Sequence, residues 1–123
     1  MLYPTQNAAC GTATRPDGSK LVVVAGGISI TERKNEVQIY NVEKGEWFMG
    51  PELPRTTYGA EAIQSGNSFF VLGGESGDGW DNYISTMYEF DAVNMTWIER
   101  EESLALARMD FYVINVNRED YCQ

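Results

Sequence analysis

The most informative absence in this chain is histidine, because its 123 residues contain none. Histidine is the commonest general base near neutral pH and the commonest metal ligand. The two cysteines, Cys10 and Cys122, lie too far apart for a zinc site and are expected to be free thiols. No Gly-x-Ser-x-Gly element and no phosphate-cradling glycine loop is present. The sequence therefore predicts a protein that is not an enzyme and has neither a cofactor nor a metal site.

Basic residues are scarce as well, with 9 lysines and arginines against 18 acidic residues and a net charge of −9. Such a charge disfavours nucleic acid and anionic membrane surfaces as partners. No stretch approaches the roughly 20 apolar residues of a membrane span. The opening MLYPTQNAA has neither a basic start nor an apolar run, which predicts no signal peptide and a cytoplasmic location by default. A secreted location is expected instead if the true N-terminus lies upstream of Met1.

What the chain does contain is one pattern written twice. The first copy reads LVVVAGG…VQIYNVEKGEW and the second reads FFVLGG…MYEFDAVNMTW. An aromatic residue stands seven positions before each tryptophan. The matched residues are Gly26, Gly27, Tyr40 and Trp47 in the first copy, and Gly73, Gly74, Phe90 and Trp97 in the second. A pattern that recurs at this spacing indicates that the chain is built from repeated structural units.

The pattern resembles the kelch motif, each copy of which forms one four-stranded blade of a β-propeller. The resemblance rests on the diglycine after an apolar strand, the aromatic-plus-Asn/Asp step, the tryptophan, and an arginine before the next unit (Arg55, Arg108). It implies an all-β fold of two four-stranded antiparallel blades plus one extra strand. The implied units are an N-terminal segment 1–7, repeats 8–50 and 51–103, the first strand of a third repeat at 104–117, and a tail 118–123.

Nine strands are predicted from apolar runs bounded by turn residues. In the order a, b, c, d of a blade, they are Ala8–Thr14, Lys20–Ala25, Glu36–Tyr40 and Glu46–Phe48, then Gly59–Gln64, Ser68–Leu72, Thr86–Phe90 and Thr96–Ile98, and finally Phe111–Val116. The two b strands are nearly continuous apolar runs, which suits strands buried on both faces. A single short helical turn is predicted between Glu101 and Arg108.

The repeated residues have physical roles in this scheme. Glycine lacks a Cβ atom, so each diglycine allows positive φ or close backbone approach at the end of its b strand. The tryptophans and the aromatic residues before them are predicted to be hydrophobic pegs between blades. Arg55 and Arg108 are predicted either to bond the backbone of a blade or to face a ligand.

Two blades and a spare strand cannot close a propeller, which needs about four to eight blades. The sequence therefore predicts that further blades from the same gene, or self-association, complete the ring.

The b–c loops and the d–a crossovers are expected to emerge on one face and to bind a protein or peptide. The candidate partner-binding residues are Arg33, Lys34, Arg55, Tyr58, Asp78, Trp80, Asp81, Tyr83 and Arg108. The loop Glu75–Ser85 is the most distinctive. Its acids faintly resemble a calcium loop but do not have the EF-hand spacing, so an aromatic recognition surface is the preferred interpretation.

The favoured function is a non-catalytic protein-interaction module, and the resemblance implies a ubiquitin-ligase substrate receptor or a cytoskeletal scaffold. One alternative is a fragment of a kelch-propeller enzyme of the copper-oxidase or sialic-acid epimerase type. Another is a fragment of a secreted adhesion or matrix protein, which the glycosylation pattern Asn94-Met95-Thr96 slightly favours.

Overall fold

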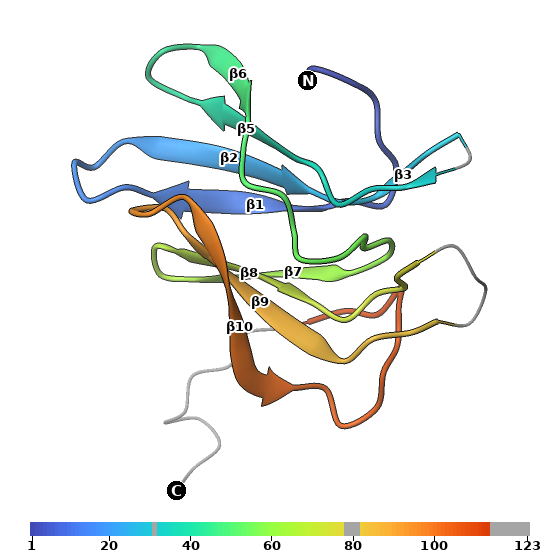
Figure 1. The fold of residues 1–123 in the computed structure, drawn as a ribbon. Coiled ribbons are helices and arrows are strands. Elements are labelled where there is room, and N and C mark those ends of the chain that lie inside the picture. Colours follow the sequence, from blue (N-terminus) through green and yellow to red (C-terminus); the bar gives the residue numbers. More distant parts are fainter. Residues whose placement is uncertain (31, 78–81, 114–123) are drawn as a thin grey trace, which may run out of the picture.

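The computed structural model describes residues 1–30, 32–77 and 82–113, and this part of the chain is built from strands without helices (Figure 1). Blade 1 is the antiparallel sheet β1 (Ala9–Thr14), β2 (Lys20–Ala25), β5 (Val37–Asn41) and β6 (Glu46–Met49). Blade 2 is the antiparallel sheet β7 (Glu61–Ser65), β8 (Ser68–Leu72), β9 (Thr86–Asp91) and β10 (Thr96–Ser103). The short strands β3 (Ile28–Ser29) and β4 (Glu32–Arg33) pair with each other beyond blade 1. The predicted all-β fold with two four-stranded antiparallel sheets is confirmed.

One predicted element was wrong, and another is described only in part. No helical turn begins at Glu101, because β10 continues to Ser103 and pairs with Thr86 of β9 after a bulge that follows Arg100. The predicted strand Phe111–Val116 is not seen over residues 111–113, and residues 114–116 lie outside the described part.

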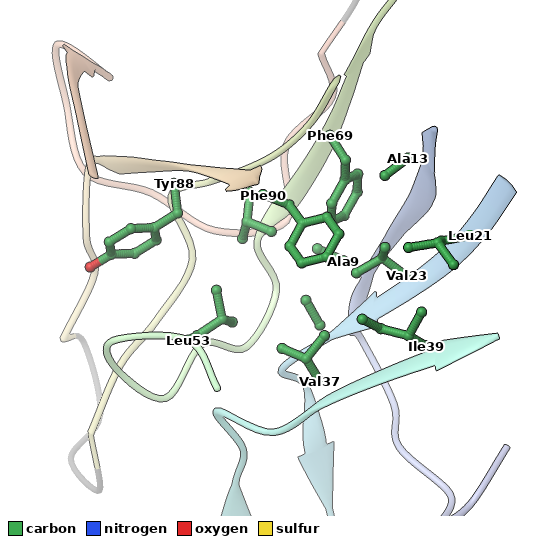
Figure 2. Packing of buried hydrophobic residues seen from close by; sticks show 12 residues of the cluster. Ala9, Ala13, Leu21, Val23, Val37, Ile39, Leu53, Phe69, Tyr88 and Phe90 are labelled. Atoms are coloured by element: carbon green, nitrogen blue, oxygen red, sulfur yellow. The ribbon is translucent and has the colours of Figure 1, made fainter. Parts of the chain in front are cut away.

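The hydrophobic core lies between the two sheets (Figure 2). We call the side of a blade that looks toward the next blade its forward face, and the opposite side its rear face. Side chains alternate between the two faces along each strand, so every second residue enters this core. The forward face of blade 1 contributes Leu21, Val23, Ala25, Val37 and Ile39, and the rear face of blade 2 contributes Phe69, Val71, Tyr88 and Phe90. Each of these side chains is at most 3% exposed.

The diglycines close the b strands with left-handed backbone. Gly26 and Gly27 have φ of 69° and 95°, and Gly73 and Gly74 have 69° and 98°. A Cβ on Gly26 would lie 2.5 Å from the carbonyl oxygen of Thr57, so a side chain there would collide with the chain that enters blade 2.

A backbone ladder links successive repeats at the start of each a strand. Gly59 donates its N–H to the carbonyl of Asn7 at 3.1 Å, and Asp110 donates to the carbonyl of Gly59 at 2.9 Å. All three residues have positive φ, at 50°, 67° and 50°. They are therefore equivalent positions of three consecutive repeats.

Other backbone hydrogen bonds recur with the same offset. In the first repeat the Lys34 N–H donates to the Gly27 carbonyl at 2.7 Å, and in the second the Ile84 N–H donates to the Gly74 carbonyl at 2.8 Å. Lys34 and Ile84 also accept hydrogen bonds from the crossover that follows each blade. The Thr57 N–H donates to the Lys34 carbonyl, and the Arg108 N–H donates to the Ile84 carbonyl. Arg108 is thus the equivalent of Thr57, so the prediction that Arg55 and Arg108 match was wrong.

Candidate functional site

The b–c loops and the crossovers between blades gather on one face, which lies to the right in Figure 1. We call it the loop face. It carries the described residues 28–30, 32–36, 75–77 and 82–85, which follow the two b strands, and 51–58 and 104–110, which follow the two d strands. The a–b hairpins and c–d turns lie at the opposite, hairpin face.

Arg33 binds across the boundary between the blades. Its Nη2 lies 2.8 Å from Oε1 of Glu75, and its Nη1 donates to the carbonyl of Gly77 at 3.0 Å. The guanidinium carbon is also 6.0 Å from the centre of the Tyr58 ring. The side chains of Arg33 and Glu75 are only 10% and 3% exposed. The pair therefore fixes one b–c loop against the next and offers little charge to a partner.

Lys34 is likewise surrounded by acids of its own loop. Its Nζ lies 3.2 Å from Oε2 of Glu32 and 3.8 Å from Oε1 of Glu36. Pairs of this exposed kind contribute about 0–1 kcal/mol to stability, but they do neutralise the local charge. The candidate binding residue Lys34 consequently offers little uncompensated positive charge to a partner.

Arg55 is exposed on the first crossover and lies near the Tyr88 hydroxyl. Burial raises the pKa of Tyr88 above its usual value of 10.0, and the positive charge of Arg55 acts in the opposite direction. This arginine therefore has both an inward contact and an accessible surface.

The remaining predicted residues are divided between the interior and the surface. Tyr58 is half-buried beneath Arg33, whereas Tyr83 is 42% exposed. Arg108 is exposed, and its Nε donates to the carbonyl of Leu106 at 3.3 Å. The predicted residues Asp78, Trp80 and Asp81 lie outside the described residues.

Sequence reasoning missed two exposed apolar residues on this face. Leu106 is 66% exposed, and Ile30 is fully exposed with a φ of 32°. Leu106 occupies the position that Arg55 occupies one repeat earlier, as the equivalence of Thr57 and Arg108 shows. Aligning the crossovers by their ends would have revealed this exchange of charge for an apolar side chain.

The aromatic signature residues pack within and between blades. The Tyr40 and Trp47 rings are 5.2 Å apart, and so are those of Phe90 and Trp97. Trp97 also donates its Nε1–H to the carbonyl of Pro51, 2.8 Å away in the crossover from blade 1. Its indole thereby connects the outer strand of blade 2 to the preceding unit.

The Asn/Asp of the signature caps the c–d turn in both blades. Oδ1 of Asn41 accepts the Lys44 N–H at 3.0 Å, and Oδ1 of Asp91 accepts those of Val93 and Asn94 at 2.9 and 3.1 Å. These hydrogen bonds from Asn94 and Val93 lower the pKa of Asp91. Asn94 is exposed in this turn.

The described residues contain no group of three histidine, cysteine, aspartate or glutamate side chains placed to hold a metal ion. Glu75, one of the acids of the calcium-like loop, is bound to Arg33. Cys10 is a free, exposed thiol on β1, and Cys122 is outside the described residues. In the part of the chain that the structure describes, no helix could span a membrane.

Two known proteins are similar to this chain, one in sequence and one in structure. No family model matches the chain. The chain is 32% identical to the F-box/kelch-repeat protein OR23 of Arabidopsis thaliana over 77% of its own length, and it spans 26% of that protein. The solved structure of YjhT, a kelch β-propeller, matches 86% of this chain with a TM-score of 0.70, 17% identity and coverage of 40% of YjhT. At that identity the structural likeness shows the fold alone.

Two four-stranded antiparallel sheets that pack face to face and are linked near their a strands by a repeating backbone ladder are adjacent blades of a β-propeller. The diglycines, the aromatic step and the tryptophans recur at equivalent places in both blades. Together with the likeness to OR23, these features show that the chain belongs to the kelch-repeat family.

Proposed function

We propose that this chain is a non-catalytic kelch module that binds a protein or peptide through its loop face. The observation that carries the proposal is the gathering of four loop segments on one face, with Arg55, Leu106 and Arg108 exposed among them. Loops held by a rigid β-scaffold are the usual place for binding residues. Arginine is also one of the residue types that contribute strongly to protein interfaces.

The exposed charges of the loop face indicate which chemical groups the partner carries. Arg33 and Lys34 are paired with acids inside the chain, whereas Arg55 and Arg108 are exposed on the two crossovers. Leu106 stands beside Arg108, whose Nε donates to its carbonyl. We infer a peptide segment in which carboxylates accompany an apolar side chain, because it would match both the arginines and the leucine.

More specifically, we propose that the chain is the substrate-recognition part of a ubiquitin ligase. The name of the relative OR23 joins an F-box to kelch repeats, and this supports the role by analogy. The enzyme alternative is a prediction from the sequence for which the described residues supply no favourable observation.

Site-specific photo-crosslinking tests the proposed face. A photoreactive residue at position 55 or 108 is expected to capture the same protein partner from cells. The matched controls carry the same residue at Asp17 or Val93, which are exposed on the hairpin face. Equal capture from both faces, or capture from the hairpin face alone, would contradict the proposal.

A charge reversal provides the second test. Arg108→Glu is expected to weaken binding of the captured partner at least about tenfold, since a carboxylate would then face a carboxylate. Asp17→Lys is the control on the other face and is expected to leave the affinity unchanged.

A further inference from the structure

Blade 2 holds Arg33 in a seat on the loop face. The seat consists of the Glu75 carboxylate, the carbonyl of Gly77 and the Tyr58 ring. Thr56 supports it, because its hydroxyl accepts the Gly77 N–H at 2.8 Å. The side chain that fills the seat therefore comes from the b–c loop of the adjacent blade.

The same backbone frame is present on blade 1. Gln6 and Ile28 exchange two backbone hydrogen bonds of 2.9 Å each, as Tyr58 and Glu75 do at 3.0 and 2.8 Å. Ile28 and Glu75 each directly follow a diglycine. The second residue after each of them has positive φ, at 32° and 79°. Blade 1 therefore carries a seat at the equivalent place.

On blade 1 this seat is an open groove with a volume of about 440 Å³. The residues that line it include Tyr3, Pro4, Ile28, Ile30, Lys34 and Glu36. Ile28 stands where blade 2 has Glu75, and the acid that is present, Glu36, has Lys34 at 3.8 Å. An arginine in the groove would lack the carboxylate that it meets on blade 2, whereas an apolar side chain would meet apolar walls.

The N-terminal wall of the groove is held in place by Gln38 of β5, whose side chain is fully buried. Its Oε1 accepts the N–H of Leu2 at 2.7 Å and that of Tyr3 at 3.2 Å. Its Nε2 donates to the Tyr3 carbonyl at 3.0 Å. These hydrogen bonds fix the segment that carries Tyr3 and Pro4, so the groove is formed in advance and little ordering is needed when it is filled.

We propose that the groove seats an apolar side chain from the b–c loop of another kelch repeat in the same gene product. That side chain occupies the position of Arg33, which directly precedes the residue whose N–H donates to the diglycine carbonyl. The equivalent seat within this chain is filled in the same way, by the b–c loop of the adjacent repeat. The chain spans 26% of OR23 and 40% of YjhT, so both relatives contain further sequence beyond the part that matches.

The two seats discriminate between b–c loops. A guanidinium in the groove would be buried against Ile28 without a carboxylate, and an apolar side chain in the other seat would leave Glu75 without its cation. Misassembly is a characteristic failure of repeat proteins, and an ionic boundary next to an apolar one favours a single order of blades. This contact is separate from the external partner, which the proposed function assigns to Arg55, Leu106 and Arg108.

Photo-crosslinking in the full-length gene product tests the seat. A diazirine residue in place of Pro4 is expected to link to an apolar residue in the b–c loop of another kelch repeat, within one polypeptide. The product then runs as a monomer on a denaturing gel, and mass spectrometry identifies the linked residue. The matched positive control has the diazirine in place of Thr56, the equivalent of Pro4, and should link to the loop that contains Arg33.

Three outcomes for position 4 would overturn the proposal when position 56 links as expected. They are a link to a separate polypeptide, a link to an arginine or to a segment other than a b–c loop, and the absence of any link.

An exchange of the seat residues tests the discrimination. Ile28→Glu is expected to raise the unfolding equilibrium constant of the full-length protein at least about tenfold, because it buries a carboxylate beside an apolar side chain. Arginine at the cross-linked position should do the same. The two changes together should recover most of the loss, since they recreate the pairing of Arg33 with Glu75. Val93→Glu, on the hairpin face, is the control for a new charge and should have little effect. Additive losses in urea unfolding, or no loss from Ile28→Glu, would overturn the proposal.

Discussion

Nη2 of Arg33 lies 2.8 Å from Oε1 of Glu75, and this ion pair joins the b–c loop of blade 1 to the first residue after the second diglycine. Both side chains are largely removed from solvent. The stability of the boundary between the blades should therefore depend on the two residues together.

A double-mutant cycle measures that dependence. Arg33→Met leaves the Glu75 carboxylate buried without its guanidinium, and Glu75→Leu leaves the guanidinium without its acid. Each single change is expected to lower the free energy of unfolding by about 3 kcal/mol. The double variant should be less destabilised than the sum, since no charge is then stranded. Urea unfolding gives the three values, and additive losses would show that the pair is not coupled.

Lys34→Met is the matched control for this cycle. Its ion pairs lie in a more exposed environment. The change should therefore alter stability by no more than about 1 kcal/mol.

The diglycine should be sensitive to a side chain for two separable reasons. Gly26 combines a φ of 69° with a Thr57 carbonyl oxygen only 2.5 Å from the position of a Cβ. Gly18 has a φ of 87° with no heavy atom within 4 Å of that position. Gly18→Ala should cost about 1–2 kcal/mol for left-handed backbone. Gly26→Ala should cost clearly more in thermal or urea unfolding, and an equal cost would mean that the close approach is unimportant.

The indole hydrogen bond to Pro51 distinguishes the two signature tryptophans. Trp97→Phe keeps most of the apolar ring but removes the donor to the Pro51 carbonyl. The expected loss is about 1 kcal/mol for the hydrogen bond, besides a smaller loss of packing. Trp47→Phe in blade 1 provides the comparison for ring size. Urea unfolding of both variants should show the larger loss at position 97.

Asp91 gives a prediction about pH. Hydrogen bonds from Asn94 and Val93 hold its pKa below the usual value of 3.8. A lowered pKa in the folded state stabilises the protein above pH 3.8, and this contribution disappears as the pH falls through the lowered value. An NMR titration of the carboxyl carbon should therefore show a midpoint below 3.8.

Asp91→Asn is the control for this titration. It reproduces the cap that Asn41 already forms in blade 1, where Oδ1 accepts the Lys44 N–H. The variant should keep the turn and remove the contribution of this residue to the acid dependence of stability. Unchanged acid dependence would assign the effect to other carboxylates, such as Asp17, whose pKa is also lowered by its hydrogen bonds to Ser19.

Local pattern was sufficient to predict the sheets but not the junctions between them. The apolar runs that precede Gly26 and Gly73 predicted the b strands, because a strand buried on both faces is apolar at nearly every position. The alignment of Arg55 with Arg108 was wrong because crossover residues are matched by backbone hydrogen bonds, which residue identity does not reveal.

On the loop face, too, the contacts of the side chains could not be predicted from the local sequence. Arg33 was predicted to bind a partner, but the fold brings Glu75 to it across 42 residues of chain, and the sequence alone does not reveal this pairing. Conversely, Leu106 was missed because a single leucine in a crossover resembles a core residue until the two crossovers are aligned by their ends. Leu53 in the first crossover is buried whereas Leu106 is 66% exposed, so the residue type alone does not distinguish the two environments.

The left-handed residues Asn7, Gly59 and Asp110 have a consequence for how such repeats diverge. Each is joined to the next by one backbone hydrogen bond, and a backbone bond of this kind does not require particular side chains. The second repeat has three more residues than the first between its diglycine and its signature aromatic residue, yet the ladder is kept. A recognition loop can therefore change in length in one repeat while the backbone connection to the next repeat is kept.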